Sequence, residues 1–333
     1  MTTRGFLLGK FLPPHQGHVF LAEFARRHCD SLTILVCSLA RDPIPGALRF
    51  AWMRELFPDC RVIPFTEDVP QEPAEHEDFW AIWRAIVKSA HPEPIDFVYA
   101  SEAYGARLAA ETGARFVPVD PLRSAVPVTG RAMLADPFAH WAFMPAPVRP
   151  YFVKSVCVFG PESTGKTRLA ERLARRFGTI CVPEYGRTYT EAFGTECPPE
   201  AFIAIARGHL AATAAGARQA NRLLVLDTDP VLTGVWSDML QGWRDPWFET
   251  VPTADLYLLC DIDVPWVDDG TRYFPDAARR SAFFARCRAE LQRRGLRHVT
   301  LSGGWETRAA TAEAAILDEF PGLRTTGGIP AAR

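Results

Sequence analysis

The segment Gly160–Thr167 reads GPESTGKT and matches, at every fixed position, the phosphate-binding pattern GxxxxGK followed by Ser or Thr. An apolar stretch over 155–159 predicts a strand before it, and 166–177 predicts a helix after it. In that setting the backbone N–H groups of the loop point inward, and the positive end of the helix dipole faces the same point. A chance glycine turn is the alternative, but both flanks favour a strand–loop–helix unit that binds a nucleoside triphosphate.

Within this loop we expect Lys166 to reach the β- and γ-phosphates of ATP and to act as a catalytic residue by stabilising charge. The hydroxyl of Thr167 is expected to ligate Mg²⁺, the cofactor that the motif implies. The remaining ATP contacts are assigned to the loop residues Gly160, Glu162, Ser163, Thr164 and Gly165.

A P-loop needs a carboxylate near its metal, and the aliphatic run 223–226 ends in Asp227. We expect Asp227 to hold Mg²⁺ through water and to count among the catalytic residues. Asp229 would extend the site toward the substrate. The alternative is an acid that caps the helix starting at Pro230, a role that suits Asp229 better than Asp227.

The segment 182–187 reads VPEYGR and ends a predicted strand at the edge where parallel strands face the binding crevice. Glu184 is therefore placed to accept a proton from, or to orient, the hydroxyl that attacks the γ-phosphate. Tyr185 and Arg187 are the substrate contacts expected beside it. A surface salt bridge between Glu184 and Arg187 stays open as the alternative.

The loop that ends at Arg272 follows a further buried strand and is long enough to carry a lid. Arg272, or the Arg279–Arg280 pair, is expected to close over the phosphates, as arginine fingers do. Trp266 or Trp236 is expected to stack on a flat ring, and Asp268 is expected to contact the substrate. Core packing of the tryptophans and a solvated helix face for the arginine pair are the alternatives.

The first half of the chain contains HQGH, His15 to His18, between its first predicted strand and its first predicted helix. Two imidazoles there suit a polyphosphate, because His15 and His18 can donate hydrogen bonds to phosphate oxygens while Gly17 lets the backbone approach closely. A metal site is the rival interpretation, but two histidines without a third ligand nearby argue against it. The ATP contacts at this site would be completed by the preceding residues Gly9, Lys10 and Phe11.

Further motifs run through both halves. In the first half they read GKFLPPHQGH, PGALRFAWMRELFPD, FWAIW, YASEAYGARLA and VDPLR, and in the second GPESTGKT, PEYGR, LDTD and DVPWVDDGTR. The first half resembles the HxGH nucleotidylyltransferase superfamily, and the second resembles P-loop ribosylnicotinamide kinases. Over nearly its whole length the chain is similar to the NadR-type family, bifunctional bacterial enzymes of NAD salvage.

The resemblance implies a kinase that uses MgATP to phosphorylate nicotinamide riboside at its 5′-hydroxyl, giving nicotinamide mononucleotide (NMN). It also implies an adenylyltransferase in which the phosphate of NMN attacks the α-phosphate of ATP, giving NAD and pyrophosphate. ATP, the riboside and NMN are then the small-molecule partners. Lys10, His15 and His18 would contact ATP phosphates. The substrate contacts implied in the first domain are Ser101, Glu102, Tyr104 and two residues that stack on nicotinamide, Trp80 and Trp83.

One stretch departs from the family pattern. The second phosphate-binding signature of the superfamily has arginine where this chain has Leu134, and threonine where it has Arg131. Losing a charged phosphate contact typically costs about 1.5–3 kcal/mol. Arg131, roughly one helical turn earlier, is the candidate replacement. Otherwise the chain is a monofunctional riboside kinase, and its first domain is weakly active or a nucleotide sensor.

Alternation of strands and helices along the chain predicts an α/β fold with two doubly wound parallel sheets. Its predicted elements include a first helix over 18–29 and a strand over 179–183. A proline-rich stretch sets the expected boundary near residue 150. We expect a nucleotidylyltransferase-like domain over 1–150, a kinase domain over 151–322 and a flexible tail over 323–333. The sequence starts directly at the first predicted strand, so the helix-turn-helix and repressor role of some relatives are not expected.

The composition bears on location and partners. The formal net charge of -2 offers no broad positive field for nucleic acid. The eight cysteines form no CxxC pair, which fits a reducing cytoplasm and neither a zinc knuckle nor a disulfide framework. No apolar run approaches the roughly 18–20 residues that cross a membrane. We therefore expect a cytoplasmic protein without nucleic-acid partners or membrane insertion, and homo-oligomer formation stays open.

Overall fold

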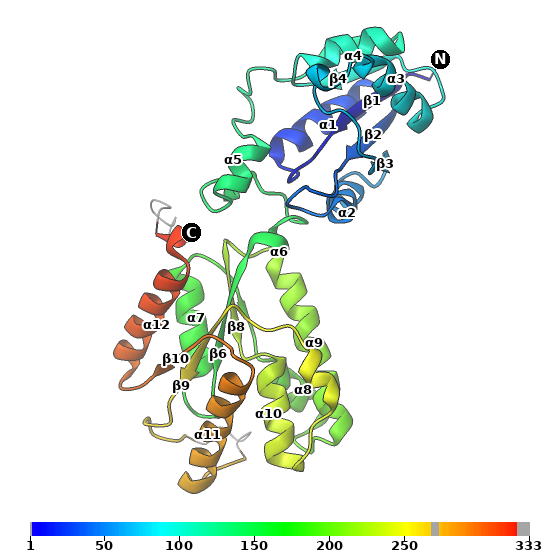
Figure 1. Cartoon of the computed structure of the whole chain (residues 1–333). Coiled ribbons are helices and arrows are strands. Elements are labelled where there is room, and N and C mark those ends of the chain that lie inside the picture. Colours follow the sequence, from blue (N-terminus) through cyan, green and yellow to red (C-terminus); the bar gives the residue numbers. More distant parts are fainter. Residues whose placement is uncertain (1, 268–272, 325–333) are drawn as a thin grey trace. The chain divides into compact units, whose positions relative to one another are not determined.

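The computed structural model describes residues 2–267 and 273–324 of the chain. Its contacts divide the chain after Val148 into two units, each with its own parallel sheet and apolar core (Figure 1). The α/β fold with two doubly wound sheets is therefore confirmed. Asp268, Arg272 and the tail from residue 325 onward lie outside the described residues.

In the first unit, five parallel strands lie in the order β3-β2-β1-β4-β5. The winding reverses at β1, so the carboxyl end of β1 lies at the switch point where open α/β sheets bind ligands. The strands are β1 Arg4–Gly9, β2 Ser31–Cys37, β3 Arg61–Phe65, β4 Phe97–Ala100 and β5 Arg115–Pro118. The helices are α1 Gln16–His28, α2 Gly46–Leu56, α3 Phe79–Ala90, α4 Tyr104–Thr112 and α5 Gly130–Ala135.

In the second unit, five parallel strands lie in the order β10-β9-β6-β8-β7, and the reversal falls at β6. The strands are β6 Lys154–Phe159, β7 Cys181–Val182, β8 Leu223–Asp227, β9 Leu256–Cys260 and β10 His298–Leu301. The helices are α6 Arg149–Phe152, α7 Lys166–Arg176, α8 Tyr185–Phe193, α9 Pro199–Ala217, α10 Pro230–Gln241, α11 Ala277–Arg293 and α12 Trp305–Glu319.

The central strand β6 is buried on both faces of its sheet. Val156 and Val158 belong to the core beneath α7 and α12, whereas Cys157 and Phe159 belong to the core beneath α9, α10 and α11. Figure 1 shows these two helix layers on opposite sides of the strands. The alternation explains the continuous apolar run, because a strand covered on both faces has no side that needs polar residues. None of the described helices is both long and apolar enough to cross a bilayer.

Several segments differ from the predicted elements. Helix α1 begins at Gln16 because His15 caps it, two residues before the expected start. The strand expected over 179–183 is reduced to Cys181–Val182, since the hydroxyl of Thr179 binds the Leu223 carbonyl and Pro183 has no N–H for a ladder. Helix α8, directly after Glu184, was not predicted.

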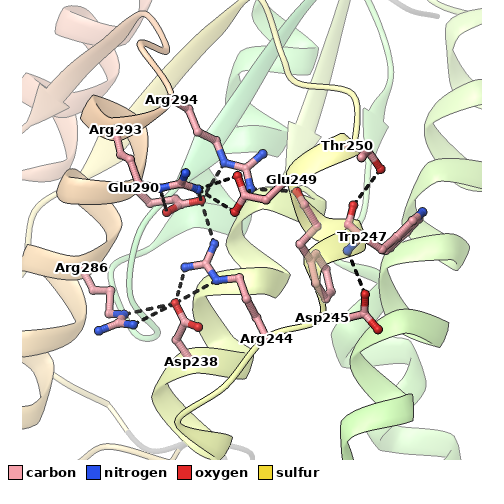
Figure 2. Close-up of polar contacts among 11 residues, drawn as sticks. Asp238, Arg244, Asp245, Trp247, Glu249, Thr250, Arg286, Glu290, Arg293 and Arg294 are labelled. Atoms are coloured by element: carbon pink, nitrogen blue, oxygen red, sulfur yellow. Dashed lines mark hydrogen bonds and ion pairs between the residues drawn. The ribbon is translucent and has the colours of Figure 1, made fainter.

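An ion-pair network holds α11 against α10 and the short turn Pro246–Thr250 (Figure 2). The carboxylate of Glu290 on α11 accepts hydrogen bonds from Arg294 Nε at 2.6 Å and from Arg244 Nη1 at 2.7 Å. Arg244 also donates to Asp238 on α10. The network therefore fixes the helix that carries Trp236, a residue that lines the pocket described below.

Replacing Glu290 with glutamine is expected to lower the free energy of unfolding of this unit by about 3 kcal/mol at neutral pH. The carboxylate is only 5% exposed, and the variant leaves its arginine partners without a counter-charge. Burial alone would raise the pKa of Glu290, but hydrogen bonds from Arg293, Arg294 and Arg244 outweigh it and hold the pKa at about 2.

Because the folded pKa of Glu290 lies below the unfolded value of about 4.3, the stabilisation is complete above that value and disappears as pH falls toward 2. Urea titrations at several pH values should therefore show the difference between wild type and E290Q shrinking in acid. Glu249→Gln is the matched control, since that carboxylate is 46% exposed and its loss should change little. If wild type and E290Q differ in their free energy of unfolding by the same amount at every pH, the low pKa assigned to Glu290 is contradicted.

Candidate active sites

The loop Gly160–Thr167 joins β6 to α7 and has glycine where no side chain fits. Gly165, which precedes α7, has φ +81°, and a Cβ there would lie 2.3 Å from the ring of Trp305. Gly160 has φ +132°, and its Cβ would lie 2.8 Å from the carbonyl oxygen of Cys260. The two glycines are thus required by backbone conformation and by close approach of neighbouring segments.

Backbone groups hold three polar side chains of this loop in place, inside the loop for Lys166 and Thr164 and outside it for Ser163. Lys166 Nζ and the hydroxyl of Thr164 both donate to the carbonyl oxygen of Pro161, each at 2.8 Å. Ser163 Oγ bonds to the backbone of Val267, accepting from its N–H at 2.8 Å and donating to its carbonyl at 3.1 Å. The ammonium of Lys166 thus lies over the loop, and its acceptor there is a backbone carbonyl.

Glu162, expected at the ATP site, lines the pocket described below, and its side chain is held by backbone groups. It is 3% exposed, and its carboxylate accepts the backbone N–H groups of Tyr273, at 3.0 Å, and Phe274, at 2.7 Å. A carboxylate has no proton to donate to a phosphate. Phosphate contacts of Glu162 would therefore come from its backbone, while its side chain anchors the segment that starts at Tyr273.

Asp227 ends β8, where its backbone lies beside Val158 of β6, and its side chain is almost fully buried. The hydroxyl of Thr167 hydrogen-bonds to this carboxylate, whereas Oδ1 has no hydrogen-bond partner among the described residues. Burial and the nearby charge of Glu184 raise the pKa of Asp227 to about 6. The structure thus brings Thr167, Asp227 and Glu184 together at the end of the P-loop.

This donor set fits a magnesium ion. Mg²⁺ prefers hard oxygen ligands, keeps several waters and binds through one or two protein groups together with phosphates. An unpartnered carboxylate oxygen beside a hydroxyl supplies such groups. In the described part of the chain no three His, Cys, Asp or Glu residues gather into a metal cage. Thr167 and Asp227 are therefore the residues that would hold the ion.

A pocket opens beside Asp227, and Lys166, Glu184 and Arg187 line it. Glu184 and Arg187 are half-buried there, which favours a role in the site over the alternative of a surface salt bridge. The rings of two further lining residues, Trp236 and Tyr273, meet at 5.6 Å and 60°. The rest of the wall is largely apolar and includes Phe202, Ile205, Leu232 and Leu240. Such a cleft suits a small polar molecule that carries a flat ring.

Tyr273 and His209 are among the lining residues that were not anticipated from the sequence. Tyr273 directly follows the loop that ends at Arg272, and only its nearness to that motif could have drawn attention to it. His209 lies in the middle of α9, in a stretch with no motif, and reaches the pocket through the packing of that helix.

Four expected residues lie elsewhere. The ring of Tyr185 packs on Gly208 of α9, where a Cβ would lie 2.1 Å from it, so Tyr185 joins two helices instead of lining the pocket. Asp229 caps α10, and its carboxylate accepts from Leu232 N at 3.0 Å and from the hydroxyl of Tyr257 at 2.6 Å.

Trp266 is half-buried outside the pocket lining, so Trp236 is the tryptophan that lines it. Arg280 is buried, not part of a solvated face, and donates to the Val264 carbonyl.

In the first unit, His15 and His18 form the start of α1. His15 Nδ1 accepts from Gly17 N at 3.1 Å, and His18 Nδ1 accepts from His15 N at 3.3 Å. Their rings stack with centroids 3.8 Å apart. A Cβ at position 17 would lie 3.0 Å from the His15 ring, which explains the glycine between the two histidines.

Both imidazoles are neutral. Burial, and then the charge of Arg123, lower the pKa of His15 to about 4. Burial, and then the charges of His15 and Arg123, lower the pKa of His18 well below its usual value. Since each Nδ1 accepts a backbone N–H, the single proton of each neutral ring is on Nε2. The pair therefore presents two N–H donors, which suit phosphate oxygens.

Around these histidines a larger pocket lies at the carboxyl ends of β1 and β4. The hydroxyl of Tyr104 shapes it by donating to the Leu8 carbonyl at 2.9 Å, and Trp83 Nε1 donates to the Pro70 carbonyl at 2.9 Å. All the site residues expected in the first half line this pocket: Gly9, Lys10, Phe11, His15, Gly17, His18, Trp80, Trp83, Ser101, Glu102, Tyr104 and Arg131.

Arg123 also lines this pocket, and no role was predicted for it. Its guanidinium binds Glu102 at 3.1 Å and contributes to the low pKa values of both histidines. The turn that presents it is held by Asp120, whose carboxylate accepts the backbone N–H groups of three following residues. The signal in the sequence was the motif VDPLR, which was noted without a function for its arginine.

Arg131 and Leu134 both lie on α5, but only Arg131 lines the pocket. The helix is capped by Thr129, whose hydroxyl accepts from Ala132 N at 3.1 Å. Arg131 thus extends into the pocket from the first turn of a capped helix. This placement suits the role of a replacement cation.

The chain is similar in sequence to known proteins over most of its length. The chain is 30% identical over 309 residues to "Trifunctional NAD biosynthesis/regulator protein NadR" of Escherichia coli (strain K12), a match covering 84% of this chain and 74% of that protein. A protein of the same name in Salmonella typhimurium is 29% identical over 306 residues, with the same shares covered. The chain belongs to the NadR family.

Solved structures agree with this placement at the level of fold. A NadR protein in complex with NR has a TM-score of 0.78 at 23% identity, over 96% of this chain and 97% of that one. A NadR protein in complex with NAD and AMP-PNP has a TM-score of 0.75 at 24% identity, with the same coverage. A family model described as an AAA domain matches residues 155–308. The NadR-type chain with its P-loop unit is therefore a nucleotide-metabolising enzyme.

Proposed function

We propose that this NadR-type chain is a bifunctional enzyme of NAD salvage. The second unit phosphorylates nicotinamide riboside with MgATP, and the first unit joins the resulting NMN to ATP, giving NAD and pyrophosphate. The observation that carries the proposal is the unpartnered Oδ1 of Asp227 beside the Thr167 hydroxyl, next to a pocket that Glu184 lines. Relatives named for NAD biosynthesis, and a NadR structure in complex with NR, support it.

In the kinase reaction, the 5′-hydroxyl of the riboside attacks the γ-phosphorus of ATP. The carboxylate of Glu184 accepts the hydroxyl proton as the new O–P bond forms and ADP leaves. Lys166 and Arg187 line the same pocket and stabilise the charge on the transferring phosphoryl oxygens. Mg²⁺, when bound by Thr167 and Asp227, neutralises charge on the β- and γ-phosphates.

In the adenylyltransferase reaction, an oxygen of the NMN phosphate attacks the α-phosphorus of ATP, and pyrophosphate leaves. The Nε2–H groups of the neutral His15 and His18 donate hydrogen bonds to phosphate oxygens, and Lys10 and Arg123 add positive charge in the same pocket. No covalent intermediate with the enzyme is needed. Positioning and charge stabilisation account for the rate.

The test measures both products of the purified chain. Riboside with MgATP should give NMN and ADP, and NMN with MgATP should give NAD and pyrophosphate. Formation of NMN without NAD would reject the adenylyltransferase and leave a monofunctional kinase whose first unit binds nucleotide as a sensor. Formation of neither product would reject the proposed function.

Arg131→Ala is expected to reduce kcat/KM of the adenylyltransferase by about 10- to 100-fold, because a charged phosphate contact is worth about 1.5–3 kcal/mol. The side chain is exposed and lines the pocket, so the fold should not suffer. Pyrophosphate release is measured in this variant and in Arg27→Ala, a matched control whose arginine is 81% exposed and lies outside the pocket lining. Equal rates in both variants would show that the departure at Leu134 is not compensated from position 131.

The proposed location is the cytoplasm. All eight cysteines are free, and Cys29, Cys37, Cys157, Cys260 and Cys287 are buried. Free buried thiols persist where the surroundings are reducing. The proposed partners are small molecules, and the proposal involves neither nucleic acid nor a membrane.

A further inference from the structure

His209 is a buried histidine that the proposed phosphoryl transfer does not use. It is 1% exposed and lines the pocket beside Asp227. Phe202 and Ile205 precede it on α9 at helical spacing and line the same pocket, so one face of this helix forms part of the pocket wall.

The proton on the ring can be assigned from its contacts. The imidazole makes a hydrogen bond with the backbone of Thr228. Because Nε2 has no partner among the described residues, this bond belongs to Nδ1. The backbone N–H of Thr228 already donates to the Val158 carbonyl at 3.1 Å, so the group that faces His209 is the Thr228 carbonyl. Nδ1 must therefore carry a proton and donate it.

Burial lowers the pKa of His209 to about 4, against an opposing effect of the Thr228 bond. At neutral pH the ring is thus neutral and has one proton, the one on Nδ1. Nε2 is left with a lone pair and no donor to fill it. A buried acceptor without a partner costs free energy, which a ligand with a donor group recovers. A metal ion is a poor match, because the described residues bring no cluster of further ligands together.

We propose that His209 is a specificity residue of the riboside pocket, whose Nε2 accepts a hydrogen bond from the bound riboside. This inference rests on the proposed kinase function. Nicotinamide riboside offers two kinds of donor, the N–H₂ of its carboxamide and its ribose hydroxyls. A riboside with a carboxylate in place of the carboxamide retains only the second kind.

Two variants separate the roles of the two ring nitrogens. Asparagine at position 209 can place its amide N–H near the position of Nδ1 and keep the Thr228 contact, but it has no atom near Nε2. Glutamine can place its amide oxygen near Nε2 and loses the Thr228 contact. We expect H209N to raise KM for the riboside about tenfold, equivalent to about 1.4 kcal/mol, with kcat and KM for ATP unchanged. H209Q should keep KM for the riboside close to that of wild type while melting at a lower temperature.

ADP formation at saturating MgATP, with nicotinamide riboside and nicotinic acid riboside varied in turn, tests the proposal. If the carboxamide is the donor, wild type prefers nicotinamide riboside and H209N loses most of that preference. If a ribose hydroxyl is the donor, H209N raises KM for both ribosides by the same factor. If wild type is active and KM for the riboside is unchanged in H209N, His209 has no role in riboside specificity, while the proposed kinase function stands. A wild type that phosphorylates neither riboside would instead overturn the proposed function.

Discussion

Lys166→Ala is expected to lower kcat/KM for riboside phosphorylation by on the order of 10³-fold, because the variant removes the ammonium that stabilises charge on the transferring phosphoryl group. The structure places this ammonium within the phosphate loop, 2.8 Å from the Pro161 carbonyl, and in the wall of the pocket that Glu184 also lines. Among the described residues, no other lysine lines this pocket. Coupled measurement of ADP release, with the riboside and MgATP each varied, checks the prediction.

Lys154→Ala is the matched control, since this lysine starts β6 on the same unit but is 45% exposed and faces Asp255 at 3.9 Å. It should retain full activity. The adenylyltransferase of the K166A protein provides a second control, because its proposed residues all belong to the first unit. A K166A protein that phosphorylates the riboside at the wild-type rate would refute the assignment of the P-loop.

The sequence predicted those parts of the sites in which the chemistry depends on consecutive residues. The P-loop and the HxGH segment each join a strand to a helix, and each combines backbone N–H groups with nearby side chains. Their glycines are explained by neighbouring side chains, because a Cβ at Gly17 or Gly165 would lie too close to an aromatic ring. Asp227 could also be predicted, because an acid at the end of an apolar strand next to β6 must face the same crevice.

Residues that reach a site through packing could not be predicted in this way. His209 is in mid-helix, and only the contact of α9 with the strand end at Thr228 brings it to the pocket. Arg123 depends on a turn with φ +52° at its own position, stabilised by hydrogen bonds to Asp120. His209 has no local pattern that distinguishes it from a structural residue, and the motif VDPLR marks Arg123 without indicating what its side chain does.

Proximity to a motif also misled where a helix began unexpectedly. Since α8 starts at Tyr185, helical geometry turns that ring toward α9 while Glu184 and Arg187 line the pocket. Asp229 directly precedes α10, so its carboxylate serves the helix N-terminus, the alternative that the sequence had already favoured for it. Nearness in sequence to a catalytic residue is therefore a poor guide to the direction of a side chain where a helix begins.

His18→Ala is expected to lower kcat/KM of the adenylyltransferase by about 10²- to 10³-fold while leaving riboside phosphorylation unchanged. The ring of His18 stacks on His15 and, being neutral with Nδ1 engaged by the His15 N–H, offers Nε2–H to a phosphate oxygen. Both histidines take part in capping α1, but the bond to His18 is the longer one, at 3.3 Å, whereas loss of the N-cap residue His15 would destabilise the helix by about 1 kcal/mol. His18 is therefore the better position to test.

The measurement is pyrophosphate release with NMN and MgATP varied, in parallel with ADP release from the riboside by the same protein. His140→Ala serves as the matched control, since that histidine belongs to the same unit but does not line the pocket. Loss of both activities in H18A would indicate unfolding, which a melting curve would detect. An H18A protein with wild-type adenylyltransferase would mean that the donated protons come from other groups in the pocket, and the assignment of Nε2 as a phosphate donor would be wrong.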